Sequence, residues 1–122
     1  MAKVSELEGA ELDYWVARVE ATVGQRVHIM GGSCYIDPGP GLRLFAPSTN
    51  WAQGGPLIEK YTLALFQETV FQKGSTWNAG MEIYCGDGNC IYMENWSIGD
   101  TPLQAICRAV VRSVFGDEVE DV

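Results

Sequence analysis

The stretch that decides the fold is an alternating run in the second half of the chain, Trp77-Asn78-Ala79-Gly80-Met81-Glu82-Ile83-Tyr84-Cys85. Apolar side chains occupy every odd position, and the even positions between them are polar, small or amphipathic. Because successive side chains of a strand point to opposite faces, this spacing predicts a β-strand with one buried face and one wet face. Beyond a glycine-rich turn, residues 90–95 repeat the alternation. The sequence therefore predicts a β-hairpin over residues 77–95.

The length of the turn decides which faces of the two strands coincide. A four-residue turn would place Ile91 and Met93 on the wet face. A three-residue turn, with Gly88 left-handed as a bulge, pairs Ile83 with Ile91. The same turn pairs Met81 with Met93. We favour the shorter turn because it buries all four apolar side chains on one face.

Two amphipathic helices are predicted, one before and one after this hairpin in the sequence. Over residues 9–21 apolar side chains recur three and four positions apart, and Asp13 belongs to the opposite, wet face. The second helix spans residues 102–115, where Thr101 can cap the first turn and Gln104 completes a capping box. Its buried stripe is predicted to comprise Leu103, Ile106, Cys107, Val110, Val111 and Val114, and its wet face Gln104, Arg108 and Arg112.

The rest of the chain predicts short strands at residues 25–30 and 61–68, separated by a long loop region rich in glycine and proline over residues 31–56. A loop of this length in a small domain is uncommon unless it has a function or is mobile. The acidic tail over 117–122 is expected to fray. The fold class predicted is α+β, a mostly antiparallel sheet of four or five strands with the N- and C-terminal helices packed on one face. No repeat or linker divides the chain, so residues 1–122 are expected to form a single domain.

Composition and charge exclude several classes of function. The 122 residues include 16 acidic and 8 basic side chains, which gives a net charge of −8. Binding to nucleic acid or to an anionic membrane needs clustered Lys and Arg, so we expect neither as a direct partner. The sequence has no run of about 20 apolar residues and no apolar signal core, so the protein is expected in the cytoplasm.

The four cysteines, Cys34, Cys85, Cys90 and Cys107, are expected to be free thiols because the cytoplasm is reducing. Cys85 and Cys90 have the spacing of a zinc knuckle across a glycine-rich turn, but no second pair of ligands accompanies them. In the favoured register these two side chains face opposite sides of the hairpin. We therefore expect no metal ion, and no motif in the sequence calls for a cofactor.

Three segments carry a resemblance to a known family. The first is Glu6-Leu7-Glu8-Gly9-Ala10-Glu11-Leu12-Asp13-Tyr14-Trp15-Val16-Ala17. The second, and most specific, is Pro47-Ser48-Thr49-Asn50-Trp51-Ala52-Gln53-Gly54-Gly55-Pro56-Leu57-Ile58-Glu59-Lys60. The third is Gly99-Asp100-Thr101-Pro102-Leu103 with the closing Gly116-Asp117-Glu118-Val119.

With these segments the chain resembles the phage NinX-like family, small phage and prophage proteins described as a domain of unknown function. Residues 31–41 and 85–90 do not align with the family. The resemblance implies a bacteriophage or prophage origin and an accessory role in the host cell cytoplasm. It implies no reaction.

The second of these segments is also the candidate binding site. The residues proposed to bind a ligand or partner are Ser48, Thr49, Asn50, Trp51, Gly54, Gly55 and Glu59. Hydroxyl and amide groups beside an indole, with glycines that let backbone amides approach closely, suit a nucleotide, a sugar or a small anion. The alternative is a capped turn, in which the polar side chains bond to local backbone, Trp51 plugs the core and Pro56 starts a short helix. The segment is not a P-loop, since it lacks the Gly-Lys-Ser/Thr ending.

No catalytic residues can be assigned. The chain has one histidine, His28, and no nucleophile-elbow motif. The carboxylates Glu82 and Glu94 fit a solvated sheet face, which could also bind a protein through neighbouring tyrosines.

Two hypotheses remain open. The first is a non-enzymatic binding protein that captures a small-molecule ligand or inhibits a host protein. The second is a small hydrolase acting on a nucleotide or sugar, with Glu59 as general base. The charge of −8 favours a basic host protein over an anionic nucleotide. The sequence leaves the oligomeric state open.

Overall fold

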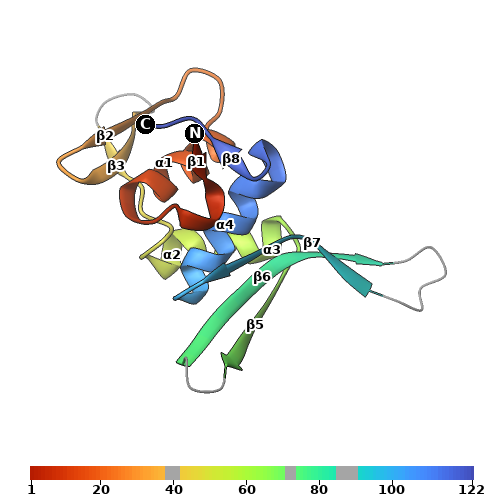
Figure 1. Ribbon diagram of the computed structural model, residues 1–122. Coiled ribbons are helices and arrows are strands. Elements are labelled where there is room, and N and C mark those ends of the chain that lie inside the picture. Colours follow the sequence, from red (N-terminus) through yellow and green to blue (C-terminus); the bar gives the residue numbers. More distant parts are fainter. Residues whose placement is uncertain (38–41, 71–73, 85–90) are drawn as a thin grey trace.

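The computed structural model describes residues 1–37, 42–70, 74–84 and 91–122 (Figure 1). Within these residues eight strands form three small antiparallel sheets, with the strand orders β1-β8, β2-β3-β4 and β5-β6-β7. In chain order the elements are β1 (Ala2–Lys3), the 3-10 turn η1 (Val4–Glu6), α1 (Gly9–Glu20), β2 (Arg26–Met30), β3 (Ser33–Asp37), β4 (Arg43–Leu44), α2 (Trp51–Gly54), α3 (Pro56–Lys60), β5 (Leu63–Val70), β6 (Gly74–Tyr84), β7 (Ile91–Gly99), α4 (Pro102–Phe115) and β8 (Glu118–Val119).

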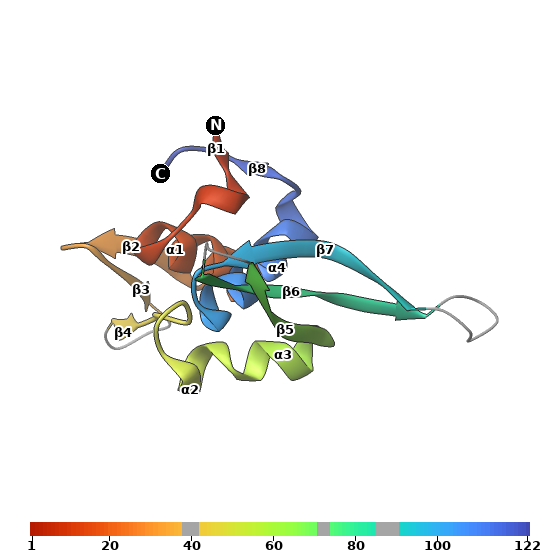
Figure 2. The same cartoon turned by 60° about the horizontal axis from the view of Figure 1, so that its bottom comes forward.

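The helices and sheets are arranged in layers. The α1 and α4 helices pack against each other, α1 contacts β2 and β3, and α4 contacts all three strands of the β5-β6-β7 sheet (Figures 1 and 2). The predicted α+β class is confirmed. The prediction of one sheet with both helices on one face is wrong, because in the described part of the chain β2, β3 and β4 pair only among themselves. Gly31 and Gly32, both at positive φ, turn β3 directly back onto β2.

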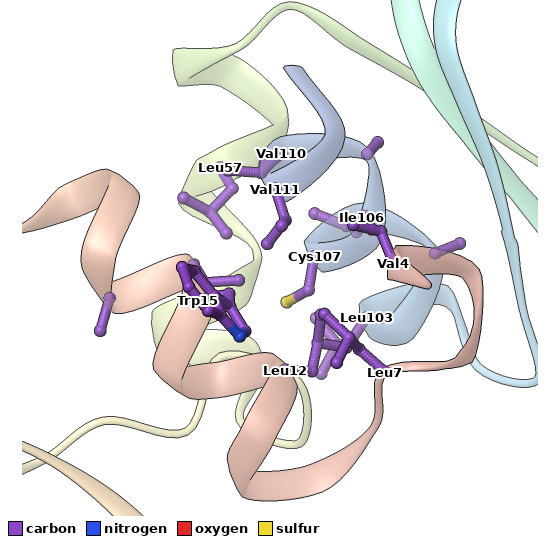
Figure 3. Close-up of a cluster of buried hydrophobic side chains, with 14 of the residues drawn as sticks. Val4, Leu7, Leu12, Trp15, Leu57, Leu103, Ile106, Cys107, Val110 and Val111 are labelled. Atoms are coloured by element: carbon purple, nitrogen blue, oxygen red, sulfur yellow. The ribbon is translucent and has the colours of Figure 1, made fainter. Parts of the chain in front are cut away.

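The hydrophobic core lies between the two long helices. Figure 3 shows side chains from η1, α1, α3 and α4 converging there. Leu12, Val16, Ile106 and Val110 have no exposed surface. Burial of this apolar surface is the main favourable term in folding.

Both predicted helices form at nearly their predicted bounds. The Thr101 hydroxyl oxygen accepts a hydrogen bond from the Gln104 backbone N–H at 3.1 Å, as the capping pattern predicts. The Gln104 side chain accepts from the backbone N–H of Asp100 at 2.8 Å. The helix ends at Phe115, and the residue that caps it, Gly116, has a φ of 80° that favours glycine.

Three residues on the helices lie on faces other than those predicted. Asp13 is 5% exposed and Arg108 is 8% exposed, although both were placed on wet faces. Val114, placed in the buried stripe, is 56% exposed. The first two are buried because a second segment lies against each of them: the turn at Ser48 contacts Asp13, and the backbone of Leu7 and Ile98 contacts Arg108.

The register predicted for the hairpin is wrong. In the structure Met81 pairs with Glu94 and Ile83 with Tyr92, so the two methionines do not oppose each other. Closer to the helices Ala79 pairs with Ser97, and an extra residue on β7 opposite Gly80 shifts the register between the two regions. The predicted turn, with Gly88 and both hairpin cysteines, lies outside the described residues.

The shift is a β-bulge. Asn95 has a φ of 56°, a left-handed conformation that asparagine tolerates better than most residues. A bulge reverses the alternation of side chains along its strand. Apolar alternation alone predicts pairing in an unbroken strand, so it cannot place such an insertion.

The two ends of the described chain are paired, because residues 118–119 of the acidic tail form β8. In the β1-β8 sheet Ala2 pairs with Val119, and the Val4 backbone N–H donates to Asp117 O at 2.9 Å. Figure 1 shows the N- and C-termini close together. Among the described residues, no helix is long and apolar enough to cross a bilayer.

Candidate functional site

Residues 47–60 form a turn followed by two short helices. The first helix, α2, begins at Trp51, where the Asn50 side chain accepts a hydrogen bond from the Ala52 backbone N–H at 2.9 Å. Gly55 between the helices has helical dihedral angles, so α3 follows α2 almost without interruption. Pro56 starts α3, as the sequence predicts.

Side chains from two directions hold the turn. The Asp13 carboxylate of α1 accepts a hydrogen bond from the Ser48 backbone N–H at 2.8 Å. On the other side, the Gln53 side chain accepts from the Ala46 backbone N–H at 2.7 Å and donates to the carbonyl oxygen of Leu44 at 2.9 Å. The turn is therefore fixed to both α1 and β4.

Three of the candidate binding residues have structural roles. Ser48 is 8% exposed. The amide N–H groups of Gly54 and Gly55 donate to backbone carbonyls within the turn and helix, each at 2.8 Å. The interpretation of this glycine pair as a nest of amides for an anion is therefore wrong. A Cβ on Gly54 would lie 2.3 Å from the Pro47 carbonyl oxygen, so this glycine permits close packing.

The other four candidates are on the surface. Thr49, Asn50 and Glu59 are exposed, and so is Trp51, with 52% of its surface accessible. Trp51 does not plug the core, so that part of the capped-turn interpretation is wrong. The local hydrogen bonding that the capped-turn interpretation predicts is confirmed at Asn50. The structure thus brings Thr49, Asn50 and Trp51 together at the start of α2, and places Glu59 two helical turns further on.

Asp13 is the buried charge behind this surface, and sequence reasoning missed it. Burial raises the pKa of the Asp13 carboxyl, and the hydrogen bond from the Ser48 backbone N–H partly opposes that effect. The family-like segments that contain Asp13 and Ser48 are thus in direct contact. Asp13 and Ser48 are 35 positions apart in the sequence, and no local pattern signals their contact.

Asp13→Asn should raise the free energy of unfolding increasingly as the pH rises from about 4 through the raised pKa of the native carboxyl. In the native protein the raised pKa contributes stability that is complete below about pH 4 and lost as the carboxyl ionises in the buried site. Asparagine keeps an oxygen acceptor for Ser48 and has no charge. Urea denaturation at several pH values measures the difference, with Glu59→Gln as the control for removal of an exposed carboxylate. A difference that shrinks with rising pH would contradict the role given to Asp13.

Two buried cysteines lie close enough to Asp13 for its negative charge to raise the pKa of their thiols. Cys34 and Cys107 are free thiols, and burial, followed by the negative charge of Asp13, raises the pKa of Cys34 to about 12. The same two causes raise the pKa of Cys107. Neither thiol is a nucleophile at neutral pH, because the reactive form is the thiolate. Cys85 and Cys90 lie outside the described residues.

Three surface cavities lie away from the 47–60 segment. Their volumes are about 270, 540 and 550 Å³, and none is lined by a candidate residue of that segment. The 540 Å³ cavity is lined by Arg108 and Arg112, which sequence reasoning placed on an ordinary wet face. The signal that could have identified them is a pair of arginines four positions apart on an otherwise apolar helix of an acidic protein.

Comparison with known proteins agrees with the segments described above. No curated protein matches the chain. A family model described as "Bacteriophage P22, NinX" matches residues 3–113, and this range includes both Asp13 and the whole 47–60 segment. Because the match extends over most of the sequence, the chain belongs to the bacteriophage P22 NinX family.

Proposed function

We propose that the protein is a non-enzymatic binding protein that captures a host protein through the Trp51 surface, which comprises the exposed side chains of Thr49, Asn50, Trp51 and Glu59. The observation that carries the proposal is a half-exposed tryptophan at the start of a fixed helix. Tryptophan is the residue type most enriched among those that dominate binding energy at protein interfaces.

The fixed position of the Trp51 surface supports this function. The side chains of Asp13, Asn50 and Gln53 accept hydrogen bonds from backbone N–H groups, and these bonds hold the turn and the first helical residues in place. A surface that is already ordered loses little conformational freedom when a partner binds.

The shape of the surface favours a protein over a small molecule. Small ligands bind in concave pockets that bury most of their area. Trp51 lines none of the cavities named above, and Figure 2 shows α2 at the periphery of the molecule. An exposed indole at the surface instead fits a pocket in a partner protein.

The charge of the chain indicates the kind of partner. A net charge of −8 favours association with a basic protein surface, because opposite charges accelerate encounter. The phage family supports a partner in the host cell, where a cytoplasmic location would place the protein. The hydrolase hypothesis gains no support, since Glu59 is exposed and lines none of the cavities in which a substrate would be held.

Trp51→Ala should leave the fold intact and reduce partner binding by roughly 1–3 kcal/mol, or about 5- to 150-fold. The side chain is half exposed, so its removal leaves no buried cavity. The measurement is quantitative capture from a bacterial host lysate by the native protein, by Trp51→Ala and by Val114→Ala. Val114 is 56% exposed on α4, so its variant controls for loss of exposed apolar surface elsewhere.

A host protein that is retained by the native chain and by Val114→Ala, but lost with Trp51→Ala, would support the proposal. Glu59→Gln tests the edge of the surface without creating a cavity and should weaken capture through loss of charge. Equal capture by all variants would remove the Trp51 surface from the function.

A further inference from the structure

A second polar site lies at the free edge of β7, on the side of that strand away from β6. The cavity there has a volume of about 540 Å³, within the range of small-ligand sites in proteins. Its lining comes from η1, β7 and α4, and comprises Ser5, Trp96, Ser97, Ile98, Arg108 and Arg112. None of the described residues that line it is acidic, although acidic residues outnumber basic ones two to one in the chain.

Arg108 is a buried charge whose hydrogen bonds go to neutral groups. It is 8% exposed, and it donates from Nε to Leu7 O at 2.9 Å and from Nη1 to Ile98 O at 2.7 Å. Burial lowers the pKa of this guanidinium, while the negative charges of Asp100 and Glu8 oppose that effect. Neither of these carboxylates, nor any other on the described part of the chain, forms an ion pair with Arg108.

Arg112 lies one helical turn further along α4 in the same wall. Its Nη1 donates to Trp96 O, and its Nε pairs with the carboxylate of Asp117 at 2.6 Å. In the described part of the structure the Nη2 atoms of Arg108 and Arg112 have no hydrogen-bond partner. Two neighbouring guanidinium groups with unused donors are the arrangement that binds phosphate and carboxylate groups.

Trp96 also lines the cavity, and two contacts hold its indole in place. The Trp96 indole N–H donates to the Asn78 side-chain oxygen at 2.7 Å. The ring of Phe66 meets the indole edge-on, with 6.0 Å between the ring centroids. Trp96 is nevertheless 47% exposed, and Ile98 beside it is 52% exposed. An oriented indole with an open surface can pack against a flat ring.

From this arrangement we infer that the β7-edge cavity binds a small anion that carries an aromatic ring, with the anionic group at Arg108 and Arg112 and the ring against Trp96. The site is separate from the Trp51 surface and shares no residue with it. The inference therefore stands or falls independently of the proposed function. Ser5 adds a hydroxyl group that can orient the anionic group.

The competing explanation is purely structural. Both arginines donate to carbonyls on the free edge of β7, and protection of an edge strand by charged side chains is common. Protection of the strand edge requires neither the unpaired Nη2 groups of the two arginines nor the exposed surface of Trp96, and it predicts no ligand. A test must therefore measure binding and not only stability.

The test is an NMR titration of the ¹⁵N-labelled protein with phenyl phosphate, inorganic phosphate and phenol. Phenyl phosphate supplies both ring and anion, and the other two probes supply one each. We expect phenyl phosphate to cause saturable shifts of the Trp96 indole N–H and of the arginine Nε–H signals, with at least tenfold weaker binding of either simpler probe. The Trp51 indole signal should not move and serves as the internal control.

Two variants make the result specific. Arg112→Gln should weaken phenyl phosphate binding by about tenfold or more, because it removes one guanidinium group of the pair. Asp117→Asn removes the carboxylate that competes for Arg112, so it should keep or increase the affinity. Shifts that do not saturate, that are the same for all three probes, or that persist unchanged in Arg112→Gln would overturn the inference.

Discussion

Replacement of Gly54 by alanine should lower the free energy of unfolding by roughly 3 kcal/mol. A Cβ at this position would lie 2.3 Å from the Pro47 carbonyl oxygen and 2.6 Å from a methyl carbon of Leu103. The first of these atoms belongs to the backbone of the turn that Asp13 holds, so it cannot move without disturbing that turn. Thermal denaturation followed by circular dichroism should show a midpoint about 10 °C lower.

The control is the reverse change two residues earlier in the same helix. Ala52 is exposed, so Ala52→Gly should cost only about 0.5–1 kcal/mol through backbone entropy. Helix propensity alone predicts that Gly54→Ala stabilises and Ala52→Gly destabilises. If Gly54→Ala is as stable as the native protein, α2 does not pack closely against the Pro47 carbonyl.

Arg108→Met should cost about 2–3 kcal/mol of unfolding free energy. The change keeps an apolar side chain of similar length but removes two charged donors, each bonded to a backbone carbonyl. Hydrogen bonds to charged groups contribute roughly 1.5–3 kcal/mol each, and relief from burying the charge offsets part of that loss. Urea denaturation measures the net effect.

Arg112→Met is the matched control for this prediction. Its side chain is 28% exposed and pairs with an Asp117 side chain that is 77% exposed, so the cost should be about 1 kcal/mol or less. Equal stability of Arg108→Met and the native protein would mean that water from the cavity satisfies the Leu7 and Ile98 carbonyls.

The sequence predicts those elements that local interactions specify. The α4 helix begins at Pro102 and ends at Phe115 as predicted, because its cap, its proline and its final glycine all act within one turn of the helix. The α1 helix is predicted nearly as well from its apolar spacing. Local patterns do not show which distant segment packs against each face of a helix or strand. The division into three sheets and the bulge at Asn95 depend on contacts between distant segments.

The candidate site shows the same limit. The 47–60 segment is a surface feature with a capped helix start, and the Asn50 cap follows from local sequence preference. The exposure of Trp51 does not follow from local sequence, because an indole in a glycine-rich segment is as compatible with a core as with a surface. The buried positions of Asp13 and Arg108 arise for a related reason, since each charge is compensated by backbone groups from elsewhere in the chain.

The pairing of β1 with β8 has a consequence for the kinetics of folding. The hydrogen bond between Met1 and Asp121 joins residues 120 positions apart, so the pairing encloses nearly the whole described chain. Closing a flexible loop of that length costs on the order of 4 kcal/mol of chain entropy. Contacts between residues this far apart in the sequence slow folding. Their entropic cost falls once α1 and α4 have docked and brought the two ends of the chain together. A circular permutant that joins the two ends by a short linker would turn this pairing into a local hairpin and should fold faster.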